Sequence, residues 1–115
     1  MKATIIYEGK VIKELPKFYE NDFGQHFKFH IKNKSDAHVD LEGYTILIKA
    51  INIHNKSILF TGECLISGDD IGVCEYIIAN EDFSLNGTYE LELELESIDY
   101  KGTIPLGYLI LLKDF

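Results

Sequence analysis

Residues 88–97, TYELELELES, alternate strictly between apolar side chains and glutamates. The apolar positions are Tyr89, Leu91, Leu93 and Leu95, and the charged positions are Glu90, Glu92, Glu94 and Glu96. A helix, at 3.6 residues per turn, would scatter these apolar residues around its axis, whereas a strand sends alternate side chains to opposite faces. The segment therefore predicts a β-strand with one face on a core and the other face in water.

The four glutamates admit three interpretations. The simplest is a solvated face that also discourages wrong strand pairing. The sharper functional interpretation is a contact face for a basic partner, which places all four glutamates among the candidate partner-binding residues. A metal-binding ladder is disfavoured, because glutamates two residues apart on a strand lie ~7 Å apart and do not converge on one cation.

The remainder of the chain also predicts strands. Residues 26–32, HFKFHIK, place three apolar side chains on one face and histidines and lysines on the other. Further strands are expected at residues 3–8, 10–15, 44–53, 73–79 and 103–112, with 44–53 in a central position, and residues 58–62 and 63–67 are expected to form one or two strands. Turn-forming residues separate these segments, Gly43 is expected in a tight turn or bulge, and residues 80–87 form a connection with room for one helical turn.

About eight short strands without an amphipathic helix predict one all-β domain over residues 1–115. The spacing of ten to fifteen residues favours an antiparallel, immunoglobulin-like β-sandwich. A chain of this length can bury a sizeable core without disulfides or metals.

The charge balance excludes several kinds of partner. Eleven basic residues against nineteen acidic ones give a net charge of −8, and no basic cluster interrupts the acidic background. This argues against nucleic acid and against anionic membranes as partners. No segment has eighteen apolar residues in a row, and the first ten residues lack the features of a signal peptide, so we expect folding in a reducing cytosol.

No motif predicts a catalytic residue, a metal ligand or a cofactor site, and we expect no enzymatic activity. His26 and His30 fall on one strand face but lie ~13 Å apart, too far to share a metal. Asp69 and Asp70 supply too few oxygens for calcium and are better explained as turn residues. The sequence also lacks a GxSxG motif and a glycine-rich phosphate loop.

The two cysteines flank the probable turn at residues 67–72. A hairpin centred on this turn would set Cys64 opposite Cys74, within reach of a disulfide. Two small, reduced, buried side chains are the favoured interpretation.

Two other segments supply candidate contacts. In residues 17–24, Phe18, Tyr19 and Phe23 are either plugs over the core or an exposed contact patch. Pro105 and Gly107 predict an edge or bulged strand, and unpaired backbone near Leu106 is a further candidate contact.

The order of the motifs resembles the N-terminal domain of phage baseplate upper proteins of Gram-positive hosts. VDLEGYTILI, residues 39–48, is similar to that family's D-L-T-G-x-x-V-x-F segment, with Glu42 in place of the common threonine. Residues 26–32 match the alternating strand before it, and residues 72–79 match a strand after it. Gly87, Tyr89, Leu93 and Leu95 follow the family's G-x-Y-x-x-x-L-x-L strand, and residues 103–112 resemble its closing strand.

This resemblance implies a β-sandwich that docks a receptor-binding or fibre protein onto a phage particle, with no catalytic residues to carry over. We therefore expect a non-catalytic adaptor or decoration domain located in the virion and assembled in the host cytoplasm. Its expected partners are other virion structural proteins and further copies of itself, in a trimeric or hexameric context. The family domain usually continues into a helical stalk, whereas this sequence ends at Phe115. Decoration of a capsid or tail, capping of a fibre, and recruitment of a separate stalk protein are the alternatives.

Two other classes of function stay open. A carbohydrate-binding module on the particle surface would use exposed aromatics, for which Tyr7, Phe18, Tyr19, Phe23 and Tyr100 are the candidates. An inhibitor or regulator would use its acidic surface to form a one-to-one complex with a basic protein.

Overall fold

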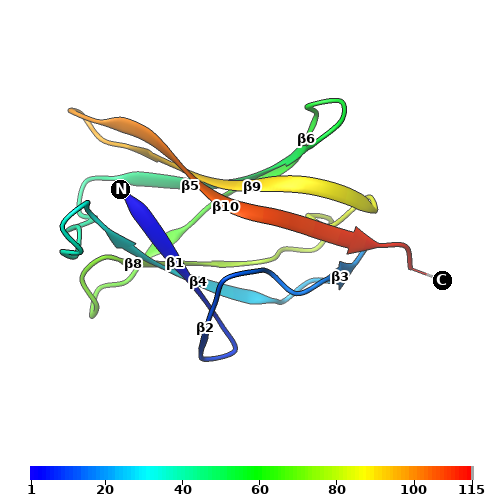
Figure 1. Ribbon diagram of the computed structural model, residues 1–115, viewed down its shortest axis with the longest axis horizontal. Helices are drawn as coiled ribbons and strands as arrows, with labels where there is room; N and C mark the ends of the chain where they lie inside the picture. The colour runs from blue at the N-terminus through cyan, green and yellow to red at the C-terminus, as the bar shows by residue number, and fades with distance from the viewer. Residues whose placement is uncertain (115) are drawn as a thin grey trace.

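The protein is a sandwich of two five-stranded β-sheets, and the structure, a computed structural model, describes residues 1–114 (Figure 1). Sheet A contains, in spatial order, β2 (Lys10–Ile12), β1 (Lys2–Tyr7), β4 (His26–Lys32), β8 (Val73–Ile77) and β7 (Leu65–Ile66). Sheet B contains β3 (Phe18–Tyr19), β10 (Lys101–Leu112), β9 (Gly87–Glu96), β5 (Thr45–Asn52) and β6 (Ile58–Glu63). Within residues 1–114 no helix is long and apolar enough to span a membrane.

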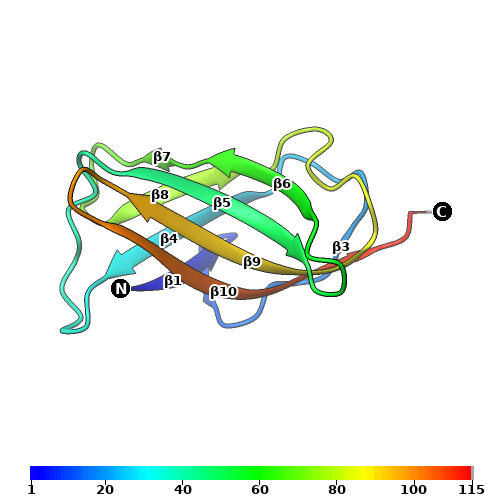
Figure 2. The same cartoon turned by 90° about the horizontal axis from the view of Figure 1, so that it is seen from above.

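The strand order is that of an immunoglobulin-like sandwich, as the sequence predicts. In that fold, strands A, B, E and D form one sheet and strands C, F and G form the other. Here β1, β4, β8 and β7 occupy the first set of positions, and β5, β9 and β10 occupy the second. Figure 1 shows the two layers edge-on, and Figure 2 looks down on sheet B with sheet A behind it.

A tyrosine near the start of β9 supports the same assignment. The buried Tyr89 hydroxyl donates a hydrogen bond to the backbone carbonyl oxygen of Leu85 at 2.7 Å. A tyrosine of strand F that bonds back to the chain a few residues upstream is the tyrosine corner of such sandwiches. The bond fixes the path by which residues 78–86 cross from sheet A to sheet B.

The alternating segments form the core, as predicted. Leu91, Leu93 and Leu95 of β9 are at most 2% exposed. In sheet B they lie between the buried residues of β5 and β10, and they face the buried aromatic residues of β4 across the sandwich. Each such leucine contributes about 2 kcal/mol through removal of its side chain from water.

The structure corrects several expected elements. Ten strands are present in residues 1–114 instead of about eight, because β3 is an additional strand of two residues and the segment expected as one or two strands at residues 58–67 forms two, β6 and β7. β3 lies within residues 17–24, which read as a loop, and it pairs with β10 in parallel, so the sandwich is not wholly antiparallel. The second strand ends at Ile12 instead of residue 15, and the connection at residues 80–86 contains a turn without a helix.

β10 contains the predicted bulge. The register against β9 shifts between Pro105 and Gly107, so Leu106 is an extra residue without a partner in β9. Gly107 has a φ of +101°, which a residue with a side chain rarely adopts. The outward positions are therefore odd-numbered before the bulge, as at Thr103, and even-numbered after it, as at Tyr108.

Candidate functional site

The outer side of sheet B is the most strongly charged surface built by the strands, and we name it the acidic face. Its charged side chains are Glu63, Glu90, Glu92, Glu94 and Glu96 together with Lys49 and Lys101. Five glutamates against two lysines give a formal charge of −3. Register places them there, because the alternate residues of β5, β9 and β10 point into the core.

Internal ion pairs occupy one of these glutamates. Lys49 Nζ lies 2.8 Å from Glu94 Oε2, and Lys101 Nζ lies 3.9 Å from Glu94 Oε1. The hydrogen bond from Lys49 holds the pKa of Glu94 below its usual value and raises the pKa of Lys49. In residues 1–114, no such ion pair involves Glu90, Glu92 or Glu96, so these carboxylates are available to a partner.

Apolar side chains border the glutamates at one end of the acidic face. The register aligns Ile58, Ile51, Glu90 and Tyr108 in one row across β6, β5, β9 and β10. Ile58 is 58% exposed and Tyr108 is 60% exposed. The face therefore presents exposed apolar surface next to unpaired negative charge, a combination that fits a partner with both apolar and basic groups.

The bulge in β10 leaves a hollow of about 250 Å³ on this face. Glu90, Glu92, Pro105, Gly107 and Tyr108 line it, together with Leu91. Because Gly107 has no side chain, the ring of Tyr108 and the two carboxylates border an open space.

The structure separates the three aromatic candidates of residues 17–24. Tyr19 is exposed and lies beside Leu112 on the same outer side as the glutamates. Phe23 is 61% exposed in a loop held by a hydrogen bond from the Gly24 amide to the Ile78 carbonyl at 2.8 Å. Phe18 is 6% exposed, so the prediction of a partner contact at Phe18 is wrong.

Phe18 is buried because β3 turns its side chain inward. Its ring centroid lies 5.8 Å from that of Phe27 and 5.7 Å from that of Phe83. Phe18 is therefore a plug over one end of the core.

Leu106 also differs in part from its prediction. Its side chain is 7% exposed and cannot serve as a partner contact. The expected unpaired edge is present, since β10 from Lys101 to Ile110 has no hydrogen-bonded strand in residues 1–114 on its side away from β9, and its role as a partner contact stays a prediction. Residues 13–15 lie beside this edge and line a second hollow with Leu106 and Tyr108.

The structure brings together His30 and His38, a pair that the sequence pattern does not predict. His30 Nε2 and His38 Nδ1 lie 2.5 Å apart, because the turn at residues 33–37 folds back and brings His38 into a bridge with Lys32. Burial, followed by the charges of His38 and Lys32, lowers the pKa of His30. Within residues 1–114 no three side chains of His, Cys, Asp or Glu are arranged to hold a metal ion.

Both cysteines are free and buried. Ile66 is the residue opposite Cys74, so Cys64 lies diagonal to Cys74 instead of directly opposite as predicted. A hydrogen bond to Cys74 and burial raise the pKa of the Cys64 thiol. Neither feature favours a reactive thiolate.

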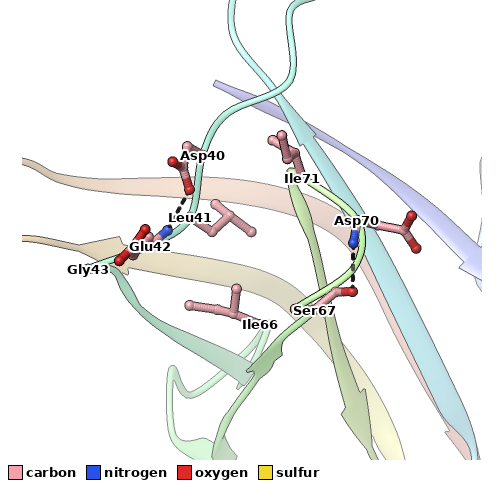
Figure 3. Close-up of a pocket in the computed structure, with 10 residues that line it drawn as sticks. Asp40, Leu41, Glu42, Gly43, Ile66, Ser67, Asp70 and Ile71 are labelled. Atoms are coloured by element: carbon pink, nitrogen blue, oxygen red, sulfur yellow. Dashed lines mark hydrogen bonds between the residues drawn. The ribbon is translucent and has the colours of Figure 1, made fainter.

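A further hollow of about 440 Å³ lies between the loops at residues 40–43 and 66–72 (Figure 3). The Glu42 amide donates to Asp40 Oδ1 at 3.0 Å, and the Asp70 amide donates to Ser67 Oγ at 3.1 Å. These bonds build the two turns, and the side chains of Asp40 and Asp70 point away from one another. The polar side chains of this hollow therefore stabilise its two turns, and they do not converge on a common point where a ligand could bind.

Comparisons of this chain with protein families, with curated proteins and with solved structures find no match. The resemblance to phage baseplate upper proteins therefore depends on the sequence motifs alone and stays a prediction.

Proposed function

We propose that this chain is a non-catalytic adaptor or decoration domain of a bacteriophage or phage-tail-like particle, docking onto other virion structural proteins through its acidic face. One observation carries the docking role: Glu90, Glu92 and Glu96 make no ion pair with any residue of 1–114, and they share their face with exposed Tyr108 and Ile58. The assignment to a phage particle comes from the resemblance of the sequence motifs to phage baseplate upper proteins.

The chemistry of the face defines the partner. Lysine or arginine side chains would pair with the free carboxylates, and Tyr108 would serve as an aromatic anchor at one end of the face. The ring of Tyr108 has only two rotatable bonds and loses little conformational freedom on binding, which favours affinity. A particle that repeats the contact around a symmetry axis converts a weak single interface into stable attachment.

The test uses purified protein mixed in turn with each structural protein encoded beside it, followed by size exclusion with light scattering. The wild type should form a complex of fixed stoichiometry with one of them. The double variant Glu90→Lys/Tyr108→Ala should weaken that complex by at least about tenfold, the loss expected for an anchor residue. The control Glu42→Lys changes charge in a loop outside both sheet faces and should bind normally.

Two results would contradict the proposal. The first is a wild-type protein that elutes alone in every mixture. The second is a double variant that binds as tightly as the wild type while its thermal unfolding is unchanged.

The hollow beside Tyr108 favours carbohydrate binding as a second candidate function. An exposed aromatic ring next to two carboxylates can stack on a sugar and accept hydrogen bonds from its hydroxyls. Calorimetry with cell-wall saccharides should then show binding that Tyr108→Ala abolishes and Tyr100→Ala, a tyrosine outside this hollow, leaves intact. Absence of heat with every saccharide would remove this candidate.

A further inference from the structure

Two strands of this chain carry opposite charge in the same alternating pattern. The outward residues of β9 are glutamates, whereas those of β4 are His26, Lys28, His30 and Lys32. β4 belongs to sheet A and β9 to sheet B, so the two sets of charges lie on opposite outer sides of the sandwich (Figure 1). Although the chain has a net charge of −8, the outer side of β4 carries only basic residues and histidines.

We name the outer side of sheet A the basic face. Its strands carry Lys2, Lys28 and Lys32 against Glu75, and Asp36 of the adjoining turn brings the formal charge to +1 with the histidines neutral. Lys2 pairs with Asp36, and His26 Nε2 lies 2.9 Å from Glu75 Oε2. Among the residues described, Lys28 and Lys32 make no ion pair, which mirrors the free glutamates opposite.

Apolar side chains accompany the charges on the basic face as well. The register aligns Val11, Ile6, Lys28, Glu75 and Leu65 in one row across sheet A. Val11 and Leu65, at the two ends of this row, are strongly exposed. The basic face therefore offers both basic groups and exposed apolar groups, the two features expected of a partner for the acidic face.

We infer that the acidic face of one copy of this chain docks on the basic face of a second copy. The inference rests on the proposed role of the acidic face as a docking surface, and it names the partner. Two acidic faces would repel each other, so a symmetric pairing through sheet B is disfavoured. A contact between unlike faces leaves one face of each kind free on every pair, so copies add head to tail into a ring or a stack.

The size of the faces sets the strength of the contact. The strands of sheet A are only two to seven residues long, so at about 3.3 Å per residue and about 4.8 Å between strands the basic face offers an area of about 360 Å². This is at the low end for specific interfaces, and the association of two isolated copies should be weak. The protein should therefore be monomeric when dilute and should assemble when it is concentrated or held on a particle.

The experiment is sedimentation equilibrium of the full chain over a range of concentrations up to about 1 mM, where even weak complexes form. The wild-type mass should rise with concentration and fall when salt is raised from about 50 mM to about 500 mM. Glu90→Lys/Glu92→Lys and Lys28→Glu/Lys32→Glu should each weaken association by at least about tenfold. The control Glu42→Lys, in a loop outside both faces, should behave as the wild type does.

Mixing the two charge-reversal variants gives the decisive result. Each substitution changes the charge by two, so the variants carry net charges of −4 and −12 and do not attract each other overall. In an equimolar mixture, however, the unaltered basic face of the Glu90→Lys/Glu92→Lys variant can dock on the unaltered acidic face of the Lys28→Glu/Lys32→Glu variant, and the two reversed faces are also opposite in charge. The mixture should therefore recover the concentration-dependent mass that each variant lacks alone.

Three results would overturn the inference. They are a wild type that stays monomeric at the highest concentration, a mixture that fails to associate, and a Glu90→Lys/Glu92→Lys variant that associates more strongly than the wild type. The milder pair Glu90→Gln and Lys28→Gln repeats the test with less risk to folding. The binding assay with other structural proteins is separate, so the proposed function can survive if self-association fails.

Discussion

Gly62 of β6 lies directly beneath the ring of Tyr76 of β8, across the sandwich. A Cβ atom added at Gly62 would overlap the ring and the hydroxyl of Tyr76. The ring cannot move freely, because its hydroxyl donates a hydrogen bond to Asp82 Oδ2 at 2.6 Å and its face stacks on Phe60 with centroids 6.1 Å apart. Gly62→Ala must therefore displace a side chain that is held at both its tip and its face.

The cost can be worked out from these contacts. Overpacking of a core position costs about 1–3 kcal/mol. Weakening the hydrogen bond to the Asp82 carboxylate costs at most about 1.5–3 kcal/mol more. Replacing a strand glycine by alanine offsets about 0.5–1 kcal/mol of this cost, because alanine loses less conformational entropy on folding. We expect Gly62→Ala to lower the free energy of unfolding by about 2 kcal/mol and the Tm by about 8 °C for a chain of this size.

Urea unfolding followed by circular dichroism measures this effect in a double-mutant cycle with Tyr76→Ala. Removal of the ring makes room, so Gly62→Ala should cost nothing in that background, giving a coupling energy of about 2 kcal/mol. Gly102→Ala is the matched control: its Cβ would overlap Tyr100, whose exposed ring can swing into water, and a change within about 0.5 kcal/mol is expected. Equal losses for the two glycine variants, or a loss that persists without the Tyr76 ring, would refute the reasoning.

Three further predictions concern Tyr89, His30 and the two cysteines. Tyr89→Phe removes the hydrogen bond to Leu85 and should lower the free energy of unfolding by about 1–1.5 kcal/mol in urea titrations. The pKa of His30 is lowered in the folded protein, so the unfolded chain binds more protons; stability should fall as the pH drops below the ordinary histidine value of 6.5, and His30→Gln should flatten that dependence in pH-resolved thermal melts. Cys64 and Cys74 should resist alkylation by iodoacetamide in native buffer and react in denaturant, because both thiols are buried and the pKa of Cys64 is raised.

The sequence predicts those parts of the fold that follow a period of two. β4 and β9 alternate over seven and ten residues, so their faces, their burial and their place in a sandwich can be read directly. β3 could not be found this way, because two residues have no period and its pairing depends on the neighbouring β10. The burial of Phe18 follows from that pairing and has no local signal. The sequence predicts one or two strands at residues 58–67, and the pairing with β8 makes β7 a separate strand.

The candidate site was predictable only along single strands. The glutamates of β9 stand out in sequence, but their cross-strand neighbours depend on register. Lys49, which occupies Glu94, is separated from it by forty-five positions. The position of Tyr108 on the acidic face could not be predicted, because the alternation of β10 changes phase at the bulge. The basic face could not be predicted without the sheet topology, because its separation from the glutamates depends on β4 and β9 belonging to different sheets.

The bulge at Leu106 shows how a single inserted residue can add to a sheet without disturbing it. Omitting Leu106 from β10 leaves a regular alternation in which Pro105 and Tyr108 still point outward. A chain one residue shorter could thus build the same ladder, but it would lack the leucine side chain now buried in the core and the hollow that Gly107 leaves open. Length variation is commonly absorbed by loops; here it is absorbed within a strand, where one additional codon supplies core packing on one side of the sheet and a surface feature on the other.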